Sequence, residues 1–169
     1  MTYNIHPIIV HFPIALLFVY SVIKILPFRK WLPNFAWKDV ELVLLTFGLL
    51  GAFAASSTGE VAEELSNPSG KLVETHEFFA SSSTWLFGLL LAGEVLTYLN
   101  SKVFSRPDFA KYQKWPNLLA SILTHKILSK VLAFLGLVAI FMTGLLGGVM
   151  VYGVTADPLA PMVLKLLGL

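Results

Sequence analysis

The sequence predicts an all-α fold: a four-helix transmembrane bundle with both termini on the non-cytoplasmic side. Three observations predict it. Of the 169 residues, 56% are hydrophobic and only 13% are charged, and the mean hydropathy is +0.76, whereas soluble domains carry about 25% charged residues. Four apolar runs are each long enough to cross a bilayer, which takes about 20 residues. Basic residues gather beside one set of span ends, which sets the orientation.

The four expected spans follow one another with connections between them. They occupy residues 7–27, 39–57, 76–99 and 129–153. A tail at residues 157–169 is apolar but too short to cross, so we expect it to lie along the surface. The whole of residues 1–169 is therefore predicted to be a single integral membrane domain.

The connections between the spans are polar or amphipathic. Residues 28–38 hold Arg, Lys, Pro and two Trp, as interfacial segments do. Residues 58–75 are acidic and contain "NPSG", which predicts a turn within a solvated loop. For residues 115–128 two interpretations stay open, a short interfacial helix or an early start of the last span.

The orientation follows from the Lys and Arg residues beside the spans. Only Lys71 and Lys165 fall on the side of the N-terminus, which we name the outer side. The other basic residues fall on the inner side: Lys24, Arg29, Lys30, Lys38, Lys102, Arg106, Lys111, Lys114, Lys126 and Lys130. This bias predicts that the inner side is cytoplasmic, that both termini face outward, and that the chain is a multi-pass protein of the cell (inner) membrane.

Three of the four histidines converge on the outer ends of the spans. His6 and His11 open the first span in "IHPIIVHFP", and His76 opens the third, whereas His125 lies near the inner side. Pro13 removes a backbone donor and is expected to bend the first turns, so we expect His11 to turn inward toward His76. Ionisable groups in membrane segments usually face a functional interior. A hydrogen-bonded polar plug without a ligand is the competing interpretation.

Carboxylates accompany these histidines and suggest a metal site. Carboxylate and imidazole ligands on facing helices hold metal ions in bundle cores. The candidate metal ligands are His6, His11, His76, Glu60 and Glu77. For the glutamates, a solvated acidic loop is the alternative.

Glu94 lies inside the third span. It is about 27 Å along a helix from His76, which places it near the inner side. We expect it to pair with Lys126 or Lys130.

Glycines in two spans predict close helix contacts. Gly48 and Gly51 lie in the second span, and Gly144 and Gly148 in the fourth. Small residues at such spacing let helix backbones approach closely. We expect Gly144 and Gly148 to face another helix and Ala139 to face lipid.

Four segments carry a family resemblance: "IHPIIVHFPIALL", "STGEVA", "HEFFA" and "TGLLGGVMVYG". They resemble the bacterial integral membrane family known as domain of unknown function 2231, over most of residues 5–154. The layout is similar to that of four-helix b-type membrane cytochromes, and relatives can be joined to redox domains, which implies a haem. The resemblance points to His6, His11 and His76. Relatives often carry a further histidine directly after "VY", where this chain has Gly153.

Three functions remain open at this level. The first is a small membrane cytochrome with a b-type haem near the outer face, because haem iron takes two axial imidazoles from different helices. His11 and His76 are the expected pair, with His6 beside them. The second is a non-haem protein that binds Zn, Cu or Fe, in a transporter or sensor, and the third is a structural subunit without a cofactor. The expected partners are the lipid bilayer and either a redox partner or further copies of the chain.

Several function classes are excluded by what the sequence lacks. It contains no cysteine, so disulfides and thiolate metal sites are absent. It contains no nucleophile and base set, no P-loop and no dinucleotide fingerprint, so we expect an electron carrier or binding protein and assign no catalytic residue. Its basic residues form no stripe of the kind that binds nucleic acid.

Overall fold

The computed structural model describes residues 5–66, 70–104 and 111–169, and these residues contain helices and no strand. The four long helices are α1 (His6–Ile25), α3 (Trp37–Ser66), α4 (Gly70–Leu99) and α6 (Lys126–Tyr152). The shorter elements are α2 (Phe28–Trp31), the π-helical turn η1 (Asn100–Phe104), α5 (Lys114–Leu123), the 3₁₀ turn η3 (Val154–Ala156) and α7 (Ala160–Leu167). Each long helix is apolar and long enough to cross a membrane. The predicted all-α fold with four spans is confirmed.

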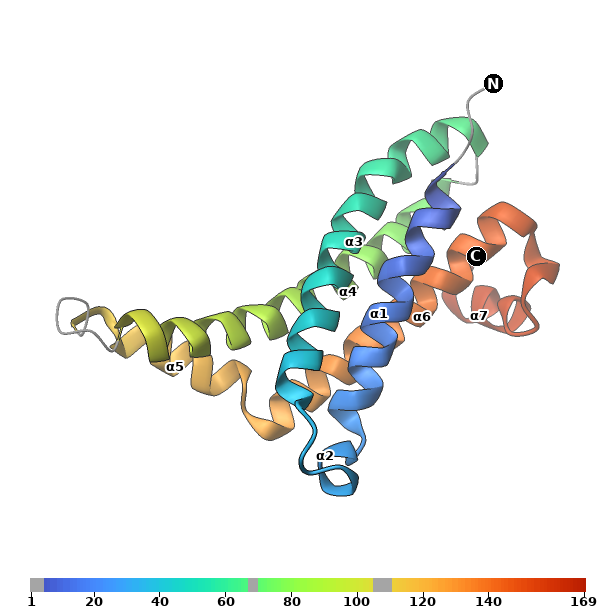
Figure 1. Ribbon diagram of the computed structural model, residues 1–169. Coiled ribbons are helices and arrows are strands. Elements are labelled where there is room, and N and C mark those ends of the chain that lie inside the picture. Colours follow the sequence, from blue (N-terminus) through green and yellow to red (C-terminus); the bar gives the residue numbers. More distant parts are fainter. Residues whose placement is uncertain (1–4, 67–69, 105–110) are drawn as a thin grey trace.

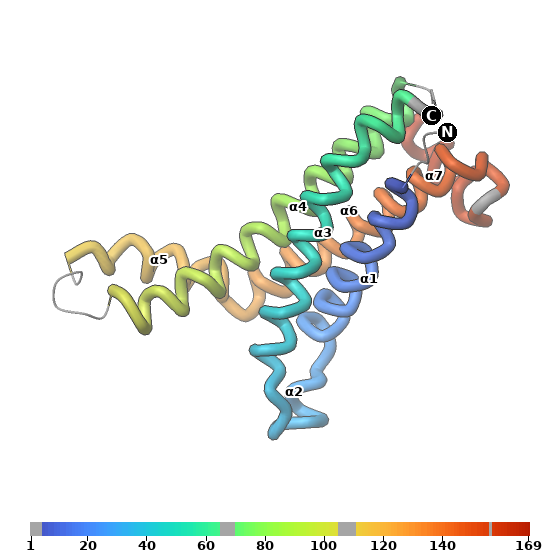
Figure 2. Tube along the Cα trace, turned by 45° about the horizontal axis from the view of Figure 1, so that its top comes forward, coloured from blue at the N-terminus to red at the C-terminus, as the bar shows by residue number. Residues whose placement is uncertain are grey.

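The long helices form two antiparallel pairs that cross each other. α1 packs along α3, α4 packs along α6, and α1 also contacts α6. Figures 1 and 2 both show α1 and α3 crossing over the α4 and α6 pair. The start of α1, the end of α3, the start of α4 and the end of α6 therefore meet at one end, which is the outer end predicted above.

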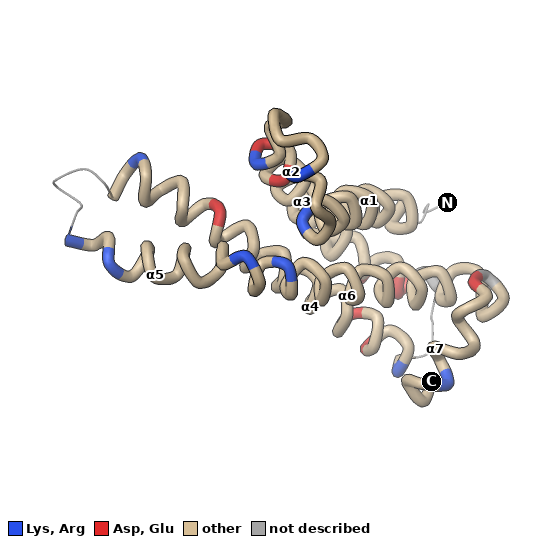
Figure 3. Tube along the Cα trace, turned by 90° about the horizontal axis from the view of Figure 1, so that it is seen from below, with Lys and Arg blue, Asp and Glu red and all other residues tan. Residues whose placement is uncertain are grey.

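Charged residues follow the predicted division between the two ends. Viewed from below, most Lys and Arg positions lie along α2, along α5 and the end of α4, and at the start of α6 (Figure 3). At the opposite end, Lys165 lies in α7 and Lys71 contacts Gly168 directly after that helix. Which end faces the cytoplasm stays a prediction.

The helices extend beyond the predicted spans on the outer side. Residues 58–66 continue α3 and residues 70–75 open α4, so the predicted acidic loop is mostly helical. The reason is that Glu, Ala and Leu favour helix, and a helix need not end where the bilayer does. The "NPSG" turn falls on residues 67–70, and the first three of these lie outside the described residues. At residues 115–128 the structure has a separate helix, since α5 ends at Leu123 and α6 begins at Lys126.

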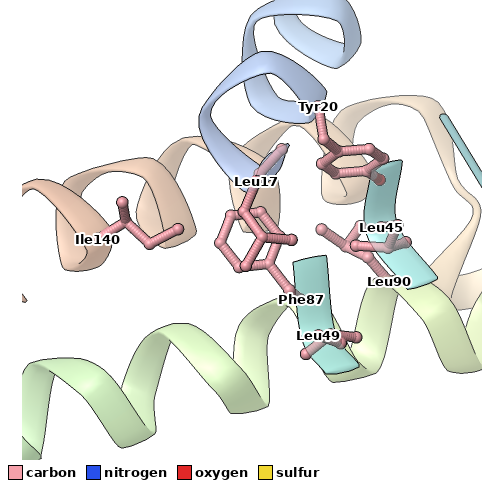
Figure 4. Packing of buried hydrophobic residues seen from close by; sticks show 8 residues of the cluster. Leu17, Tyr20, Leu45, Leu49, Phe87, Leu90 and Ile140 are labelled. Atoms are coloured by element: carbon pink, nitrogen blue, oxygen red, sulfur yellow. The ribbon is translucent and has the colours of Figure 1, made fainter. Parts of the chain in front are cut away.

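A core cluster fills the crossing point of the four helices (Figure 4). Its members are Leu17, Tyr20, Leu45, Leu49, Phe87, Leu90, Ala133 and Ile140. Phe87 is 0% exposed, and its ring meets Tyr20 edge to face with centroids 5.9 Å apart. The ring lies against Gly136 of α6, where a Cβ atom would be 2.7 Å from Phe87 Cζ. The absent side chain at residue 136 is therefore what lets α4 and α6 approach.

Close contact between α1 and α3 depends on glycine and proline. Pro13 is buried inside α1, and a Cβ atom at Gly51 would lie 3.2 Å from its Cδ. A Cβ atom at Gly48 would lie 2.5 Å from Leu17 Cδ2. The predicted close approach at these two glycines is confirmed, and α1 continues as a helix through Pro13.

In the last span the prediction is confirmed for Gly144, which faces Ile14 of α1, and is wrong for Gly148 and Ala139. A Cβ atom at Gly148 would meet nothing within 4 Å, and one at Gly144 would make an ordinary 3.7 Å contact with Ile14. Ala139, expected to face lipid, is only 4% exposed. The packed stripe of α6 follows the helical period along another line, through Ser129, Ala133, Gly136 and Ile140.

The C-terminal tail folds back onto the outer ends of α4 and α6. Its helix α7 shares a second apolar cluster with α6, formed by Leu145, Leu146, Val149, Ala160 and Val163. Lys71 Nζ at the start of α4 donates a hydrogen bond to the carbonyl oxygen of Gly168 at 2.6 Å. The C-terminal tail therefore covers one side of the outer end of the bundle.

Candidate functional site at the outer helix ends

His6 is the inward-facing histidine of α1. It is the first residue of the helix and is half-buried. Its Nδ1 lies 2.9 Å from Thr58 Oγ1 of α3. The Thr58 hydroxyl also lies 3.0 Å from the carbonyl oxygen of Ala55, and when its single hydrogen is donated there, Nδ1 of His6 donates to Thr58. The lone pair of the neutral imidazole then lies on Nε2.

His76 comes to the same place from α4. The residue is half-buried, and it lies near enough to His6 for a charge on one ring to repel a charge on the other. A Cβ atom at Gly147 of α6 would lie 3.3 Å from His76 Cε1, so this glycine leaves the space that the ring occupies. His76 Nδ1 is buried and has no hydrogen-bond partner among the described residues. Two imidazoles from different helices thus share one end of the bundle, as predicted.

The expectation that His11 turns inward is wrong for the packing of this chain. His11 is exposed, and its Nδ1 is hydrogen-bonded to the carbonyl oxygen of Pro7 on its own helix. Five residues along a helix correspond to about 500°, or about 140° in projection, so His11 and His6 point to different sides. His6 shares its side with Pro13 and Leu17, which are buried against α3. Pro13 therefore fits the helix contact and does not redirect His11.

The predicted carboxylate ligands do not join the two inward histidines. Glu60 and Glu77 are both exposed. Within the part of the chain that the structure describes, no three His, Asp or Glu side chains lie close enough together to hold a metal ion. What the outer end offers is a pair of imidazoles.

A second polar cluster lies at the inner end. Glu41 of α3 is 3% exposed and accepts hydrogen bonds from Lys24 Nζ at 3.0 Å and Arg29 Nη2 at 2.8 Å. Lys24 also lies 3.5 Å from Glu94 of α4. Buried charges are costly unless they are paired, and here each carboxylate has a cation.

The partner predicted for Glu94 is wrong. Its described cation is Lys24 of α1, and Lys130 instead donates to the carbonyl oxygen of Ile25 at 2.7 Å. The reason is that α1 crosses onto α6, which brings the end of α1 between α4 and α6. Sequence spacing along one helix does not reveal such a crossing.

Tyr20 belongs to the inner cluster as well as to the core. It is 1% exposed, and Lys24 Nζ lies 6.0 Å from its ring centroid. Its hydroxyl is buried and has no partner among the described residues. Sequence reasoning did not single out Glu41 or Tyr20. The available signal was an acidic residue near the start of an apolar run and a lysine near the end of the preceding one.

Four apolar helices, packed as two crossing pairs with polar clusters at both ends, define a helical multi-pass integral membrane protein. The chain belongs to the family described as predicted membrane protein (DUF2231), whose model matches residues 2–157. The family resemblance drawn from the sequence segments is confirmed. Neither the curated proteins nor the solved structures contain a match to this chain.

Proposed function

We propose that this protein is a small membrane cytochrome that binds one b-type haem at the outer helix ends and transfers electrons there. The axial ligands in this proposal are His6 and His76. The observation that carries it is the meeting of these two imidazoles, one from α1 and one from α4, at the same end of the bundle. Two histidines from different helices are an established axial ligand set for haem iron.

The number of ligands favours haem over a free metal ion. A structural or catalytic zinc site takes three or four protein ligands, and no such group lies within the described residues. Haem brings four equatorial nitrogens of its own, so the protein supplies only the two axial ones. A pair of imidazoles without a third ligand matches that requirement.

The state of each histidine also fits a ligand role. Thr58 holds His6 through Nδ1, and such a contact fixes the orientation of the imidazole ring, as outer partners of ligating histidines do. His76 has a buried Nδ1 without a partner, and an unpaired buried polar group costs roughly 1–3 kcal/mol. Ligation through one nitrogen polarises the ring and strengthens the other as a donor to a carbonyl or water.

Room for a porphyrin must come from helix movement. Two open surface hollows lie at the inner end, beside α2, and are lined by residues such as Arg29, Pro33 and Phe35. The outer end joins two helix pairs, so the haem would enter where these pairs meet. Gly147 and the open position at Gly148 give α6 a surface without side chains at this level.

The haem would supply one-electron oxidation and reduction. The chain's own residues would hold its iron with His6 and His76 and would surround it with the apolar cluster shared by α6 and α7. Burial of this kind limits water access and tunes the reduction potential. The residues at the inner end take no part in this site.

The test is the absorption spectrum of the protein purified in mild detergent from cells supplied with haem precursor. The proposal predicts a Soret band, α and β bands on reduction, and a pyridine haemochrome ratio near one haem per chain. Stoichiometric zinc or copper without a Soret band would replace this proposal with the non-haem alternative. Protein that carries neither would leave the histidines as a structural polar contact.

A further inference from the structure

A lateral arm leaves the bundle at its inner end. We define the arm as residues 95–104, at the end of α4 and in η1, together with residues 111–123, which contain α5. Figures 1 and 2 both show it projecting sideways, away from α1 and α3. α5 packs back along α4, and a Cβ atom at Gly93 would lie 2.8 Å from Leu123 Cβ. The end of α5 is thus seated closely on α4.

One face of α5 is apolar and uncovered by the described chain. The exposed side chains are Trp115 at 70%, Leu118 at 47%, Leu119 at 49% and Ile122 at 46%. Their spacing of i, i+3, i+4 and i+7 puts them on one side of the helix, opposite Ala120, which is 5% exposed and faces α4. A helix of 10 residues is about 15 Å long and cannot span a bilayer. This stripe therefore needs an apolar cover that lies alongside the helix.

Unpaired cations border the stripe. Lys102, Lys111, Lys114 and Lys126 are all exposed, and none of them takes part in an ion pair among the described residues. The sequence has no Asp or Glu at residues 95–104 or 111–156. Figure 3 shows basic positions along this arm. Residues 105–110, which include Arg106 and Asp108, lie outside the described residues.

Aromatic side chains lie at the level of these cations. Tyr98 is 62% exposed and Tyr112 is 57% exposed, and Lys111 Nζ lies 4.8 Å from the Tyr112 ring centroid. Tyr and Trp prefer the boundary between hydrocarbon and headgroups. An apolar stripe flanked by lysines and aromatic rings is the pattern of a helix that lies in the plane of that boundary.

We propose that the arm lies on the leaflet at the inner end and binds anionic phospholipid headgroups through Lys102, Lys111 and Lys114, together with Lys126 at the start of α6. The apolar stripe would enter the acyl region while the lysines contact the phosphates. Charge complementarity carries the choice of occupant, because these lysines have no carboxylate partner within the described ranges 5–66, 70–104 and 111–169, and such lysines attract an anionic surface. Continuity supports it as well, since the arm directly extends a membrane-spanning helix. The inference is independent of haem binding.

The experiment uses the full chain in bilayers of equal phosphatidylcholine and phosphatidylglycerol. Trp31, Trp37 and Trp85 are replaced by Phe, so that Trp115 is the single fluorophore. Bromine is attached to the acyl chains of one lipid at a time. The quenching of Trp115 fluorescence by each brominated lipid then gives the association constant of phosphatidylglycerol relative to that of phosphatidylcholine. The proposal predicts strong quenching by both lipids, stronger by brominated phosphatidylglycerol, with the preference falling as salt is added.

Matched double variants show whether the lipid preference depends on lysines of the arm or on the net charge of the whole chain. Each lysine near an anionic surface contributes roughly a fivefold preference, so Lys111→Gln with Lys114→Gln is expected to lower the relative association constant by up to about 25-fold. Lys71→Gln with Lys165→Gln removes the same charge at the outer end and is expected to leave it unchanged. Native mass spectrometry of retained lipid gives the same comparison with all four tryptophans present.

Three outcomes would overturn the proposal. Equal quenching by the two brominated lipids would show that the arm does not select charge. Absence of quenching by either would show that α5 lies outside the bilayer or against another protein. An equal loss of preference in both double variants would show that the lysines of the arm are not the binding site.

Discussion

Replacing Gly136 by alanine should destabilise the bundle because the new methyl group has no space. A Cβ atom there would lie 2.7, 2.8 and 3.2 Å from three atoms of the Phe87 ring. The ring cannot easily retreat, since it is 0% exposed and rests against Tyr20 on its far side. Overpacking of this kind costs roughly 1–3 kcal/mol, and alanine returns up to about 1 kcal/mol through its higher helix propensity.

Gly148→Ala is the matched control on the same helix. It gains the same propensity, but its methyl group would meet nothing within 4 Å. The difference between the two variants therefore isolates the contact with Phe87. We expect Gly148→Ala to have a free energy of unfolding about 1–3 kcal/mol above that of Gly136→Ala.

The measurement is unfolding in mixed micelles with increasing sodium dodecyl sulfate, followed by circular dichroism. A second test places Gly136→Ala in a Phe87→Leu background, where the shorter side chain should remove most of the difference. Equal stability of the two glycine variants would refute the close contact between α4 and α6 on which the described fold depends.

Two further substitutions test other parts of the fold by the same assay. Glu41→Gln should lower the free energy of unfolding by roughly 3–5 kcal/mol, because it leaves Lys24 and Arg29 without their buried partner. Arg29→Gln should lower it by less than about 1 kcal/mol, because that side chain is 49% exposed. Similar losses in the two variants would contradict the described burial of Glu41. Gly153→Ala should cost roughly 1–3 kcal/mol, since its φ of 81° and ψ of 176° suit only glycine, and a neutral result, like that expected for Gly70→Ala, would show that the end of α6 is built differently.

The spans and the meeting of histidines were predictable from local patterns. Apolar runs of sufficient length predict four spans, and alternation of direction then puts His6 and His76 at one end without any knowledge of packing. The family-specific segments predicted the family independently, and the match to residues 2–157 confirms that family. These inferences need only chain direction and hydropathy.

The face of the helix on which each residue lies was harder to predict from the sequence. His6 and His11 differ by a rotation that depends on which face of α1 meets α3, and that face is set by Gly48 and Gly51 on another helix. Gly136 and Gly148 look alike in the sequence, but only one lies where α6 meets α4. Glu94 found Lys24 because two helix pairs cross, and crossing angles follow from many side chains together.

Gly153, directly after α6, is a position at which this chain departs from the sequence pattern of its family. The family resemblance drawn from the sequence implies a histidine at this position in relatives, whereas the backbone here has a positive φ that favours glycine. A histidine would need a different end to α6. In the function that we propose, the outer end of this chain therefore relies on His6 and His76 as its ligands.

The central claim is that these two histidines, and not His11, form the ligand pair. The most direct measurement is the haem content of purified single variants, each checked for correct folding by its elution volume and helicity. His6→Ala and His76→Ala should each lose the bound haem, because each removes one of the two axial nitrogens. His11→Ala and His125→Ala should keep it, since His11 is exposed and bonded to its own helix and His125 is exposed at the inner end. Retention of haem by His6→Ala together with its loss in His11→Ala would contradict the account.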